Sequence, residues 1–304
     1  MGPDHSFVSR PSSSSCRVPI QLPGLRAALG VWDGFILDLW GVIHDGVAAY
    51  PHSVETLRTL KQHGSKIIFL SNAPRRARSL VQQMEDMGIP EALYDAILSS
   101  GEVVRRDLME RTREGFSALG QRCFHLGPDR DTSIYEDTGV SQVPLEQADF
   151  IMNTGPVELT DSVEQYLPLL KKAQARRLTM ICANPDRVVI REGREVVCAG
   201  ALADAYHRMG GIVLWCGKPD PEIYNDCLLR LGIPASRVCV IGDSLDTDMV
   251  GAAASGISGV WITGGIHAKE VDGGYGKPGD PLRMARLTAA HGVAPTAVLP
   301  GFIW

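Results

Sequence analysis

The sequence predicts an α/β fold in which a parallel sheet is flanked by helices, with a second αβ unit inserted into the chain. Short apolar runs that suit buried strands alternate with helical segments, which is the pattern of βαβ units. Several of these runs end in polar residues where a turn begins. The composition of the chain changes near Gly115, and we expect the second unit to start there.

The first part of the chain carries three expected strands, each followed by a helix. Apolar residues recur at helical spacing between Ser53 and Gly64, with Ser53 as the expected N-cap and Gly64 as the stop. In chain order we expect a short helix at 25–29, a strand at 35–39, a helix at 53–63, a strand at 66–72, a helix at 74–87, a strand at 96–99 and a helix at 101–113.

The second unit begins with a new series of strands, and the first pattern then returns. Glu192-Gly193 lies between two short runs and predicts a hairpin. We expect strands at 122–126, 149–154 and 178–183, a helix at 161–176, hairpin strands at 187–190 and 195–198, a resumed core strand at 212–216, a helix at 221–231, a strand at 237–243, a helix at 246–255, a strand at 259–262 and a helix at 281–291. The expected domains are a core of 20–115 and 206–304 and an inserted unit of 116–205.

Composition excludes several classes of function. The chain has 304 residues, of which 44% are hydrophobic and 21% charged, and its net charge of −5 gives no general attraction to nucleic acid. It has no apolar run of about 18 residues, so we expect no membrane span. A homo-oligomer is compatible with the sequence, which carries no signal for or against one.

Cysteine usage and the N-terminus indicate the compartment. Seven cysteines are present and none forms a C-x-x-C pair, which favours buried thiols in a reducing compartment over disulfides or a zinc site. We therefore expect a cytoplasmic protein. Residues 1–6 match an acylation pattern, but the Ser- and Pro-rich stretch of residues 1–19 favours a disordered tail. The cluster Arg75-Arg76-Ala77-Arg78 is interpreted as the solvated start of a helix.

The stretch from Gly34 to Gly46 contains an acid at the end of an apolar strand. Asp38 follows Phe35, Ile36 and Leu37, and a buried carboxylate is costly unless it is paired or bound to a metal. Ligands of open α/β sheets bind at the carboxyl ends of the strands. Asp38 is therefore either a structural acid, paired or capping, or a reactive group.

Other expected core strands are also followed directly by polar residues. Ser71-Asn72, Lys218 and Asp243 each follow an apolar run, and Asp248 lies five residues after Asp243. Parallel strands bring these groups to one edge of the sheet. Each of them alone is weak evidence, because Lys218 suits a surface turn and Asp248 suits the first turn of a helix. Together they indicate a site.

Phosphoryl transfer is the chemistry that these groups suit. A phosphate monoester and the carboxylates of Asp38 and Asp243 repel one another unless Mg²⁺ and Lys218 balance the charge. The Ser71 hydroxyl and the backbone N–H of Asn72 can bind phosphate oxygens. Asp38 would be the nucleophile, and water would then hydrolyse the aspartyl-phosphate. Asp248 is expected to support Lys218 or a metal-bound water.

In this order the residues resemble the haloacid dehalogenase (HAD) superfamily. The signature of that superfamily is an Asp-led strand, a Ser or Thr, a Lys and a Gly-Asp-x-x-x-x-Asp motif, which residues 242–248 match here. The chain looks most like the class IIA (NagD-like) branch, from Phe35 to the C-terminus. The strings that carry this likeness are Gly41-Val42-Ile43-His44-Asp45-Gly46, Leu70-Ser71-Asn72-Ala73-Pro74, Ala183-Asn184-Pro185-Asp186 and Gly217-Lys218-Pro219. The resemblance implies a Rossmann-like core, a C2-type cap inserted before the lysine, and a phosphatase of sugar or nucleotide type.

Trp40 departs from the family pattern. The family's phosphatases generally carry a second Asp at this position, which donates a proton to the leaving oxygen and activates the attacking water. Trp does neither, and such acid–base help is worth about 10²–10⁴ in rate. The resemblance still implies metal ligation by Asp38, Asp243 and the backbone carbonyl of Trp40, whose side chain would pack beside the site. His44 and Asp45 follow the motif in members that keep the second Asp, so they are not replacements.

Three functions therefore stay open. The first is a Mg²⁺-dependent phosphatase of a small phosphorylated metabolite, with a proton borrowed from the cap or the substrate. The second is a catalytically weak or silent module that binds a phosphometabolite or a partner protein. The third cleaves a carbon–halogen or carbon–phosphorus bond through Asp38. Asn184 and Asp186 are equally compatible with a substrate contact and with a loop cap.

Overall fold

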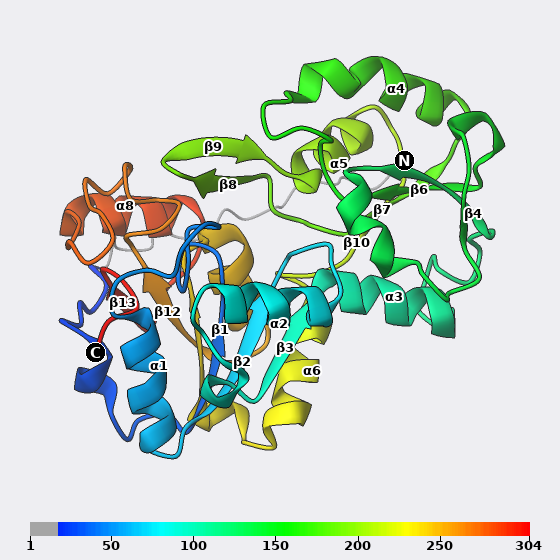
Figure 1. Cartoon of the computed structure of the whole chain (residues 1–304). Coiled ribbons are helices and arrows are strands. Elements are labelled where there is room, and N and C mark those ends of the chain that lie inside the picture. Colours follow the sequence, from blue (N-terminus) through cyan, green and yellow to red (C-terminus); the bar gives the residue numbers. More distant parts are fainter. Residues whose placement is uncertain (1–17) are drawn as a thin grey trace, which may run out of the picture.

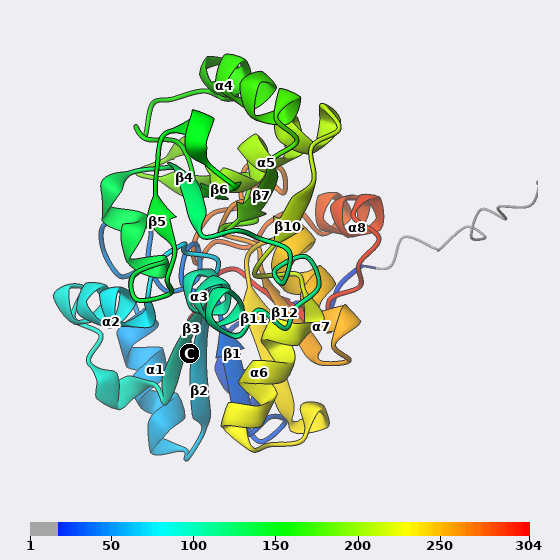
Figure 2. The ribbon, with the colours of Figure 1, turned by 90° about the vertical axis from the view of Figure 1, so that its right-hand side faces the viewer.

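The computed structural model describes residues 18–304 and contains two parallel sheets of unequal size with a hairpin between them (Figures 1 and 2). The acylation pattern, and the tail apart from its last two residues, lie outside the described residues. Over residues 18–304, none of the helices is long and apolar enough to cross a membrane. The expected α/β class, with parallel sheets flanked by helices, is confirmed.

The larger sheet has six parallel strands in the order β13-β12-β11-β1-β2-β3. Its strands are β1 (Gly34–Leu37), β2 (Lys66–Ser71), β3 (Ala96–Ser99), β11 (Val238–Gly242), β12 (Ser258–Ile262) and β13 (Ala297–Leu299). β1 lies between β2 and β11, with Leu37 opposite Phe69 and Ile241. The residues that follow these three strands therefore meet at one edge of the sheet.

Helices cover both faces of this sheet (Figures 1 and 2). They are α1 (Ser53–Gln62), α2 (Ala77–Asp86), α3 (Ser100–Glu110), α6 (Pro221–Leu231), α7 (Val250–Ala254) and α8 (Pro281–Ala290). Successive side chains of a strand point to opposite faces. Phe35 and Leu37 share a core with residues of α1 and α2, whereas Ile36 belongs to a core that includes residues of α3 and α6. Burial on both faces explains why the strand is an unbroken apolar run.

The smaller sheet has five parallel strands in the order β10-β7-β6-β4-β5. They are β4 (Arg122–Leu126), β5 (Ser141–Gln142), β6 (Phe150–Asn153), β7 (Thr179–Cys182) and β10 (Val213–Trp215). Residues of α4 (Val163–Ala175) and α5 (Ala199–Arg208) form a core with its strands. The antiparallel hairpin of β8 (Val188–Arg191) and β9 (Arg194–Val197) is confirmed and projects toward the core unit (Figure 1). Its turn residues Glu192 and Gly193 both have positive φ.

The expected return to the core sheet at 212–216 is wrong. β10 pairs with β7, with Val213 opposite Met180, and thus belongs to the smaller sheet. The reason is α5, which the sequence analysis did not predict and which packs against β7 and β10 as the crossover of a βαβ unit. We therefore propose that the second core segment begins near residue 217, rather than at 206.

Other differences are local. Two short strands, β5 and β13, which have two and three residues, were not predicted from the sequence. The expected helix 246–255 begins with a π-helical turn, Leu245–Met249, before α7. Ser53 is the first residue of α1 rather than its N-cap, and its hydroxyl donates to the Tyr50 carbonyl at 2.9 Å. Short 3₁₀ turns lie at Leu25–Ala28, Glu91–Leu93, Asp129–Ile134, Leu145–Gln147 and Ala235–Arg237.

Candidate active site

Asp38 lies directly after β1 at the carboxyl edge of the six-stranded sheet. It is 8% exposed, and its N–H donates to the Ile241 carbonyl at 2.9 Å, which continues the pairing with β11. Its Oδ1 accepts from the Leu39 N–H at 2.8 Å and lies 2.8 Å from Lys218 Nζ. Burial raises the pKa of Asp38 well above its usual value, although the charge of Lys218 opposes this effect.

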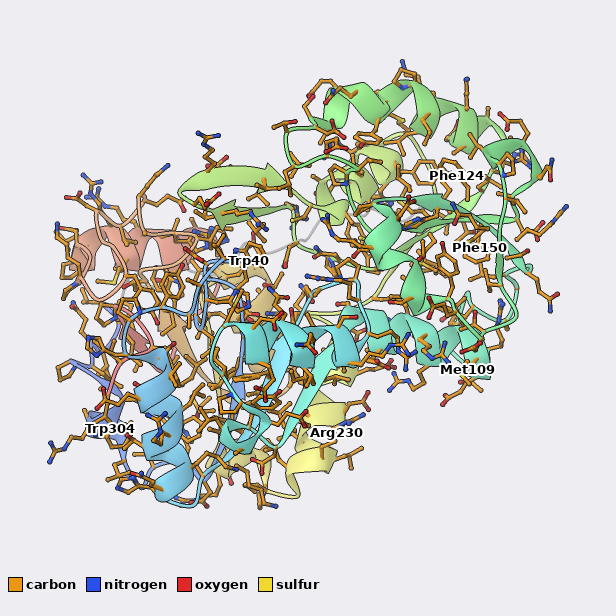
Figure 3. The ribbon with its side chains drawn as sticks, viewed as in Figure 1. Trp40, Met109, Phe124, Phe150, Arg230 and Trp304 are labelled. Carbon is orange, nitrogen blue, oxygen red and sulfur yellow. The ribbon has the colours of Figure 1, made fainter. Side chains whose placement is uncertain are left out.

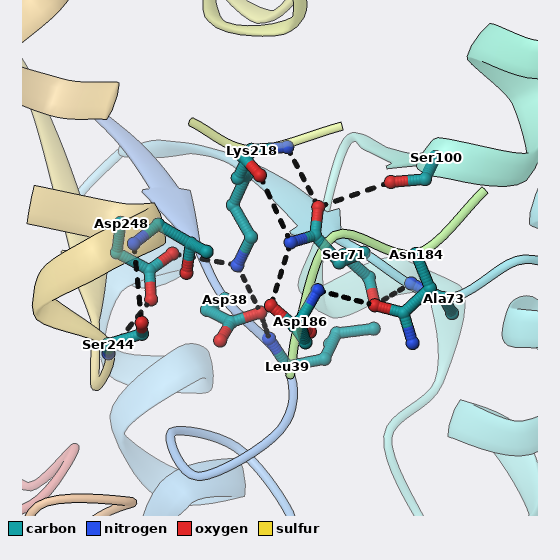
Figure 4. Close-up of polar contacts among 12 residues, drawn as sticks. Asp38, Leu39, Ser71, Ala73, Ser100, Asn184, Asp186, Lys218, Ser244 and Asp248 are labelled. Atoms are coloured by element: carbon teal, nitrogen blue, oxygen red, sulfur yellow. Dashed lines mark hydrogen bonds and ion pairs between the residues drawn. The ribbon is translucent and has the colours of Figure 1, made fainter. Parts of the chain in front are cut away.

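Lys218 and Asp248 form a buried ion pair beside Asp38 (Figure 4). Lys218 Nζ lies 2.7 Å from Asp248 Oδ1, and the two residues are 2% and 1% exposed. Asp248 Oδ2 accepts from the Ser244 N–H at 3.1 Å, which fixes the carboxylate. Burial disfavours the ammonium, but the carboxylates of Asp248 and Asp38 outweigh burial and raise the pKa of Lys218. Lys218 is therefore charged at neutral pH.

The backbone holds Asp243 in a tight cradle on the other side of Asp38. Its Oδ2 accepts from the Ile266 N–H at 2.7 Å, and its carbonyl accepts from Trp261 Nε1 at 2.9 Å. A Cβ on Gly41 would lie 1.9 Å from Asp243 Oδ2, and one on Gly265 would lie 2.2 Å from the same oxygen. Only glycine fits at these two positions, and Gly41 also has a φ of 76°.

The charges at this edge of the sheet do not balance. Oxygens of Asp38, Asp243 and Asp248 lie within 4.8 Å of one another, and Lys218 is the cation that pairs with two of them. Burial and the neighbouring Asp248 raise the pKa of Asp243 to about 7. Buried carboxylate oxygens in excess of their counter-charges are the donor set that a hard divalent cation takes. The residues present therefore fit such a cation.

Ser71 and Asn72 complete the expected set at the end of β2, and both are buried. The Ser71 Oγ accepts from the Ala73 N–H at 3.2 Å. The Asn72 side chain joins three segments of the chain. Its Nδ2 donates to Asp186 Oδ1 at 2.8 Å, and its Oδ1 accepts from the Lys218 N–H at 2.8 Å and from Ser100 Oγ at 3.1 Å (Figure 4). Asn72 thus holds Lys218 and the second unit in place.

The loop of Asn184 and Asp186 reaches from the second unit to this edge. Asn184 Oδ1 accepts from the Asp186 N–H at 3.0 Å, which shapes the loop as a local cap. Asp186 contacts Asn72, and both loop residues line the cavity beside Asp38. Burial raises the pKa of Asp186, while Lys218 opposes the shift. The loop cap is therefore present, and Asp186 additionally faces the site.

Trp40 connects the turn after β1 with the hairpin. Its Nε1 donates to the carbonyl of Ile190 in β8 at 2.8 Å, and Figure 3 shows Trp40 between the core and the hairpin. The ring lies close over Gly46, where a Cβ would come within 2.3 Å of the indole. Its centroid lies 5.6 Å from that of His44. Trp40 therefore does more than pack beside the site, because it anchors a segment of the second unit.

Two cavities adjoin Asp38, and Asp38 and Trp40 line both of them. The first, of about 340 Å³, is also lined by Ser71, Asn72 and residues of the second unit. The second, of about 500 Å³, lies on the side of Asp243 and the loop around Gly265. The first cavity is lined by Ser71 and Asn72, two of the three expected phosphate-binding residues, and is of a size for a small metabolite.

Several residues of the first cavity were not predicted from the sequence, among them His44 and Arg75. His44 is 2% exposed, its Nδ1 accepts from the Gly46 N–H at 3.0 Å, and burial lowers its pKa to about 4. Arg75 also lines the cavity, with its side chain 27% exposed, so its interpretation as part of a solvated helix start is wrong. That interpretation holds for Arg78, which is 65% exposed. Nothing local in the sequence separates the two arginines.

This fold and this site define a hydrolase with an Asp at the end of its first core strand, and comparison gives its family. A family model described as haloacid dehalogenase-like hydrolase matches residues 35–141, and a HAD-hydrolase-like model matches residues 215–298. A haloacid dehalogenase-like hydrolase of Brucella suis 1330 is 32% identical, with 92% of this chain and 99% of that chain covered and a TM-score of 0.79. The chain belongs to the haloacid dehalogenase-like hydrolase family.

Two further relatives narrow the branch. A structure described as a putative nagD protein is 27% identical, with 77% of this chain and 89% of that chain covered and a TM-score of 0.60. The phospholysine phosphohistidine inorganic pyrophosphate phosphatase of Rattus norvegicus is 26% identical over 260 residues, which are 81% of this chain and 85% of the relative. These similarities support the class IIA (NagD-like) branch that the motifs predicted.

Proposed function

We propose that the protein is a Mg²⁺-dependent phosphatase that removes phosphate from a small metabolite of sugar or nucleotide type through an aspartyl-phosphate at Asp38. One observation carries the proposal: a buried carboxylate, fixed by a charged lysine and flanked by further carboxylates, opens on a cavity of about 340 Å³. The name of the rat relative, a phosphatase, supports the reaction class.

Asp38 is oriented for nucleophilic attack. Its Oδ1 is held by the Leu39 N–H and by Lys218, so Oδ2 is the oxygen available to attack phosphorus. As the Oδ2–P bond forms, the P–O bond to the leaving group breaks. Water then attacks the same phosphorus, which releases phosphate and restores the Asp38 carboxylate.

The other residues bind and balance the phosphoryl group. Lys218 offsets its negative charge while it orients Asp38. The Ser71 hydroxyl and the backbone N–H of Asn72 bind its oxygens. Asp38, Asp243 and the Trp40 carbonyl would hold Mg²⁺, which would neutralise charge on the phosphoryl oxygens when bound. Asp248 would support the site through Lys218.

The proton for the leaving oxygen is the step that Trp40 cannot supply. The second unit brings three carboxyl groups to the cavity, Asp131, Glu158 and Asp186, and Asp186 is the one that is hydrogen-bonded to Asn72 at the end of β2. Burial raises the pKa of Asp186, which is the direction that suits a proton donor. We propose Asp186 as the proton donor, with substrates that have good leaving groups least dependent on it. Asn184 would position it through the hydrogen bond to its N–H.

A second candidate is a catalytically silent module that binds Mg²⁺ and a phosphometabolite or partner protein. The observation that favours it is again Trp40, whose indole is committed to the Ile190 carbonyl in place of an acid. The two candidates differ in turnover, whereas a phosphometabolite is a ligand for both. We also propose that the protein acts in the cytoplasm, since the six cysteines within residues 18–304 are free and buried.

The test compares wild type with Asp38→Asn at the nucleophile and Asp272→Asn as a control. Asp272 is exposed and has a φ of 57°, a conformation that Asn also accepts. Hydrolysis of p-nitrophenyl phosphate and of a metabolite phosphate panel is measured with Mg²⁺, and binding is measured by calorimetry. The phosphatase is supported if Asp38→Asn abolishes turnover and Asp272→Asn keeps it. Tight binding without turnover supports the silent module. If neither turnover nor binding is observed, both candidates are refuted.

A further inference from the structure

The first cavity is lined by three arginines that the phosphatase chemistry does not use. Arg75 follows β2, Arg130 lies in the 3₁₀ turn Asp129–Ile134, and Arg191 ends β8. Burial, together with the positive charges of Arg130 and Arg191, lowers the pKa of Arg75. Three separate segments thus bring positive charge to one wall of the cavity.

Asp131 lies among these arginines and has an unsatisfied oxygen. It is 4% exposed, and within residues 18–304 its Oδ1 has no hydrogen-bond partner. The Nε atoms of Arg75 and Arg130 lie 3.8 and 3.9 Å from it, beyond hydrogen-bonding distance. A buried carboxylate oxygen without a donor costs free energy, which the two nearby guanidinium charges reduce. In this part of the cavity the three guanidinium groups lie near one buried carboxylate, while the other acids of the lining are Asp38, Glu158 and Asp186.

Contacts within the protein fix the backbone at or next to two of these arginines. The Arg75 carbonyl accepts from Ser99 Oγ at 2.6 Å, and Gly101 packs so closely on it that a Cβ would lie 2.4 Å from that oxygen. Arg191 directly follows Ile190, whose carbonyl is bonded to Trp40. Trp40 therefore fixes the backbone directly before Arg191, a contact that the indole N–H provides and a carboxylate could not.

We propose that Arg75, Arg130, Asp131 and Arg191, here called the arginine cluster, bind a second anionic group of the substrate, a carboxylate or a second phosphate. Planar guanidinium groups bind both anions in a bidentate manner. Asp131 would accept a hydrogen bond from a neighbouring hydroxyl or ammonium group. This inference rests on the proposed function and narrows its substrate class to phosphomonoesters whose remainder is charged.

The size of the cavity limits the substrate. Its volume of about 340 Å³ lies at the lower end of the range of ligand pockets, about 300–1,000 Å³. That space suits a phosphorylated acid or a bisphosphate of a few carbons and leaves little room for a large remainder. Suitable probes are therefore 3-phosphoglycerate, fructose 1,6-bisphosphate and glycerol 3-phosphate, which carry a carboxylate, a second phosphate and an uncharged remainder.

The test measures kcat and KM for the three probes in wild type, Arg75→Gln and Arg191→Gln. Arg194→Gln is the matched control, because Arg194 is an exposed residue of the same hairpin outside the lining of the cavity. We expect wild type to prefer at least one charged probe over glycerol 3-phosphate by about tenfold or more in kcat/KM. Each cavity variant should lose about tenfold of that preference through KM, and Arg194→Gln should keep it. The charged probe that wild type prefers distinguishes a carboxylate from a phosphate.

Binding separates failure of this inference from failure of the proposed function. The same probes are titrated by calorimetry into Asp38→Asn, alone and combined with Arg75→Gln or Arg191→Gln. Preferential binding of a charged probe that these changes abolish supports the cluster even if no substrate turns over. The inference is overturned if wild type has equal kcat/KM for charged and uncharged probes, or if both variants lose kcat/KM equally for every probe. Turnover of p-nitrophenyl phosphate in the same experiment would still support the phosphatase. Arg191→Gln keeps the test decisive if Arg75→Gln fails to fold.

Discussion

Replacing Trp40 by Asp introduces the acid that the family's phosphatases carry and removes the contact with the hairpin. The variant loses the hydrogen bond from Nε1 to the Ile190 carbonyl and the packing of the ring over Gly46. Its new carboxyl would stand two residues after Asp38, beside the cavity that both residues line. The change therefore acts on the rate and on stability in opposite directions.

Both effects can be sized. General acid–base help is worth about 10²–10⁴ in rate, so an acid at position 40 adds up to that factor, reduced by whatever part Asp186 already supplies. Loss of the indole hydrogen bond costs about 1 kcal/mol. Loss of the half-buried ring adds about 2 kcal/mol, which is half the usual cost of removing a fully buried aromatic. We thus expect Trp40→Asp to be less stable by about 3 kcal/mol and faster on an alkyl phosphate, with less than about tenfold change on p-nitrophenyl phosphate.

The assay measures kcat/KM on both substrates with Mg²⁺, together with thermal denaturation. Trp40→Phe is the control, because it keeps an aromatic ring but has neither the N–H nor an acid. We expect it to lose about 1 kcal/mol and to gain no rate. The idea that position 40 lacks only an acid is refuted if folded Trp40→Asp is no faster on the alkyl phosphate than Trp40→Phe, since the leaving oxygen would then already receive its proton from Asp186 or need none.

Three further predictions concern the charges around Asp38. Lys218→Met should abolish turnover and destabilise the fold by about 3 kcal/mol, because it leaves buried carboxylates unpaired; unchanged denaturation would contradict this. Mg²⁺ at about 100 times its Kd should raise the free energy of unfolding by about 2.7 kcal/mol in wild type and much less in Asp243→Asn, with a chelator reversing the gain. The lowered pKa of His44, about 4 against 6.5, means that the unfolded chain binds the extra proton, so stability falls as pH drops from 6.5 to 4. Relative to His44→Asn, wild type should lose about 3 kcal/mol over that interval, and parallel pH profiles would exclude a buried neutral His44.

The sequence predicted the core strands and the edge where their polar residues meet, because both follow from local patterns. An apolar run that ends in Asp38 or Asp243 indicates both that the strand is buried and where the strand ends. The placement of β10 could not be read in this way, since its three residues suit either sheet. Its neighbour depends on α5, a helix that the sequence analysis did not predict.

The remaining features of the site depend on contacts between distant segments. The partner of Trp40 is the Ile190 carbonyl, 150 residues away, and a backbone acceptor leaves no signal in the sequence. Arg75 and Arg78 look alike in sequence, and only the packing of the second unit over β2 separates a cavity residue from a surface residue. The side chain of Asn72 likewise gains its partners, Asp186 and Lys218, from two other parts of the fold.

The central claim is that Asp38 is the nucleophile of a phosphatase. The direct measurement mixes the Mg²⁺-loaded enzyme with p-nitrophenyl phosphate, quenches it in acid within one turnover and locates the covalent phosphate by peptide mass spectrometry. The account predicts phosphate on Asp38 in wild type and none at this position in Asp38→Asn. The control Asp272→Asn should carry phosphate on Asp38 to the same extent as wild type. Turnover without label on Asp38, or with label on another residue, would contradict it.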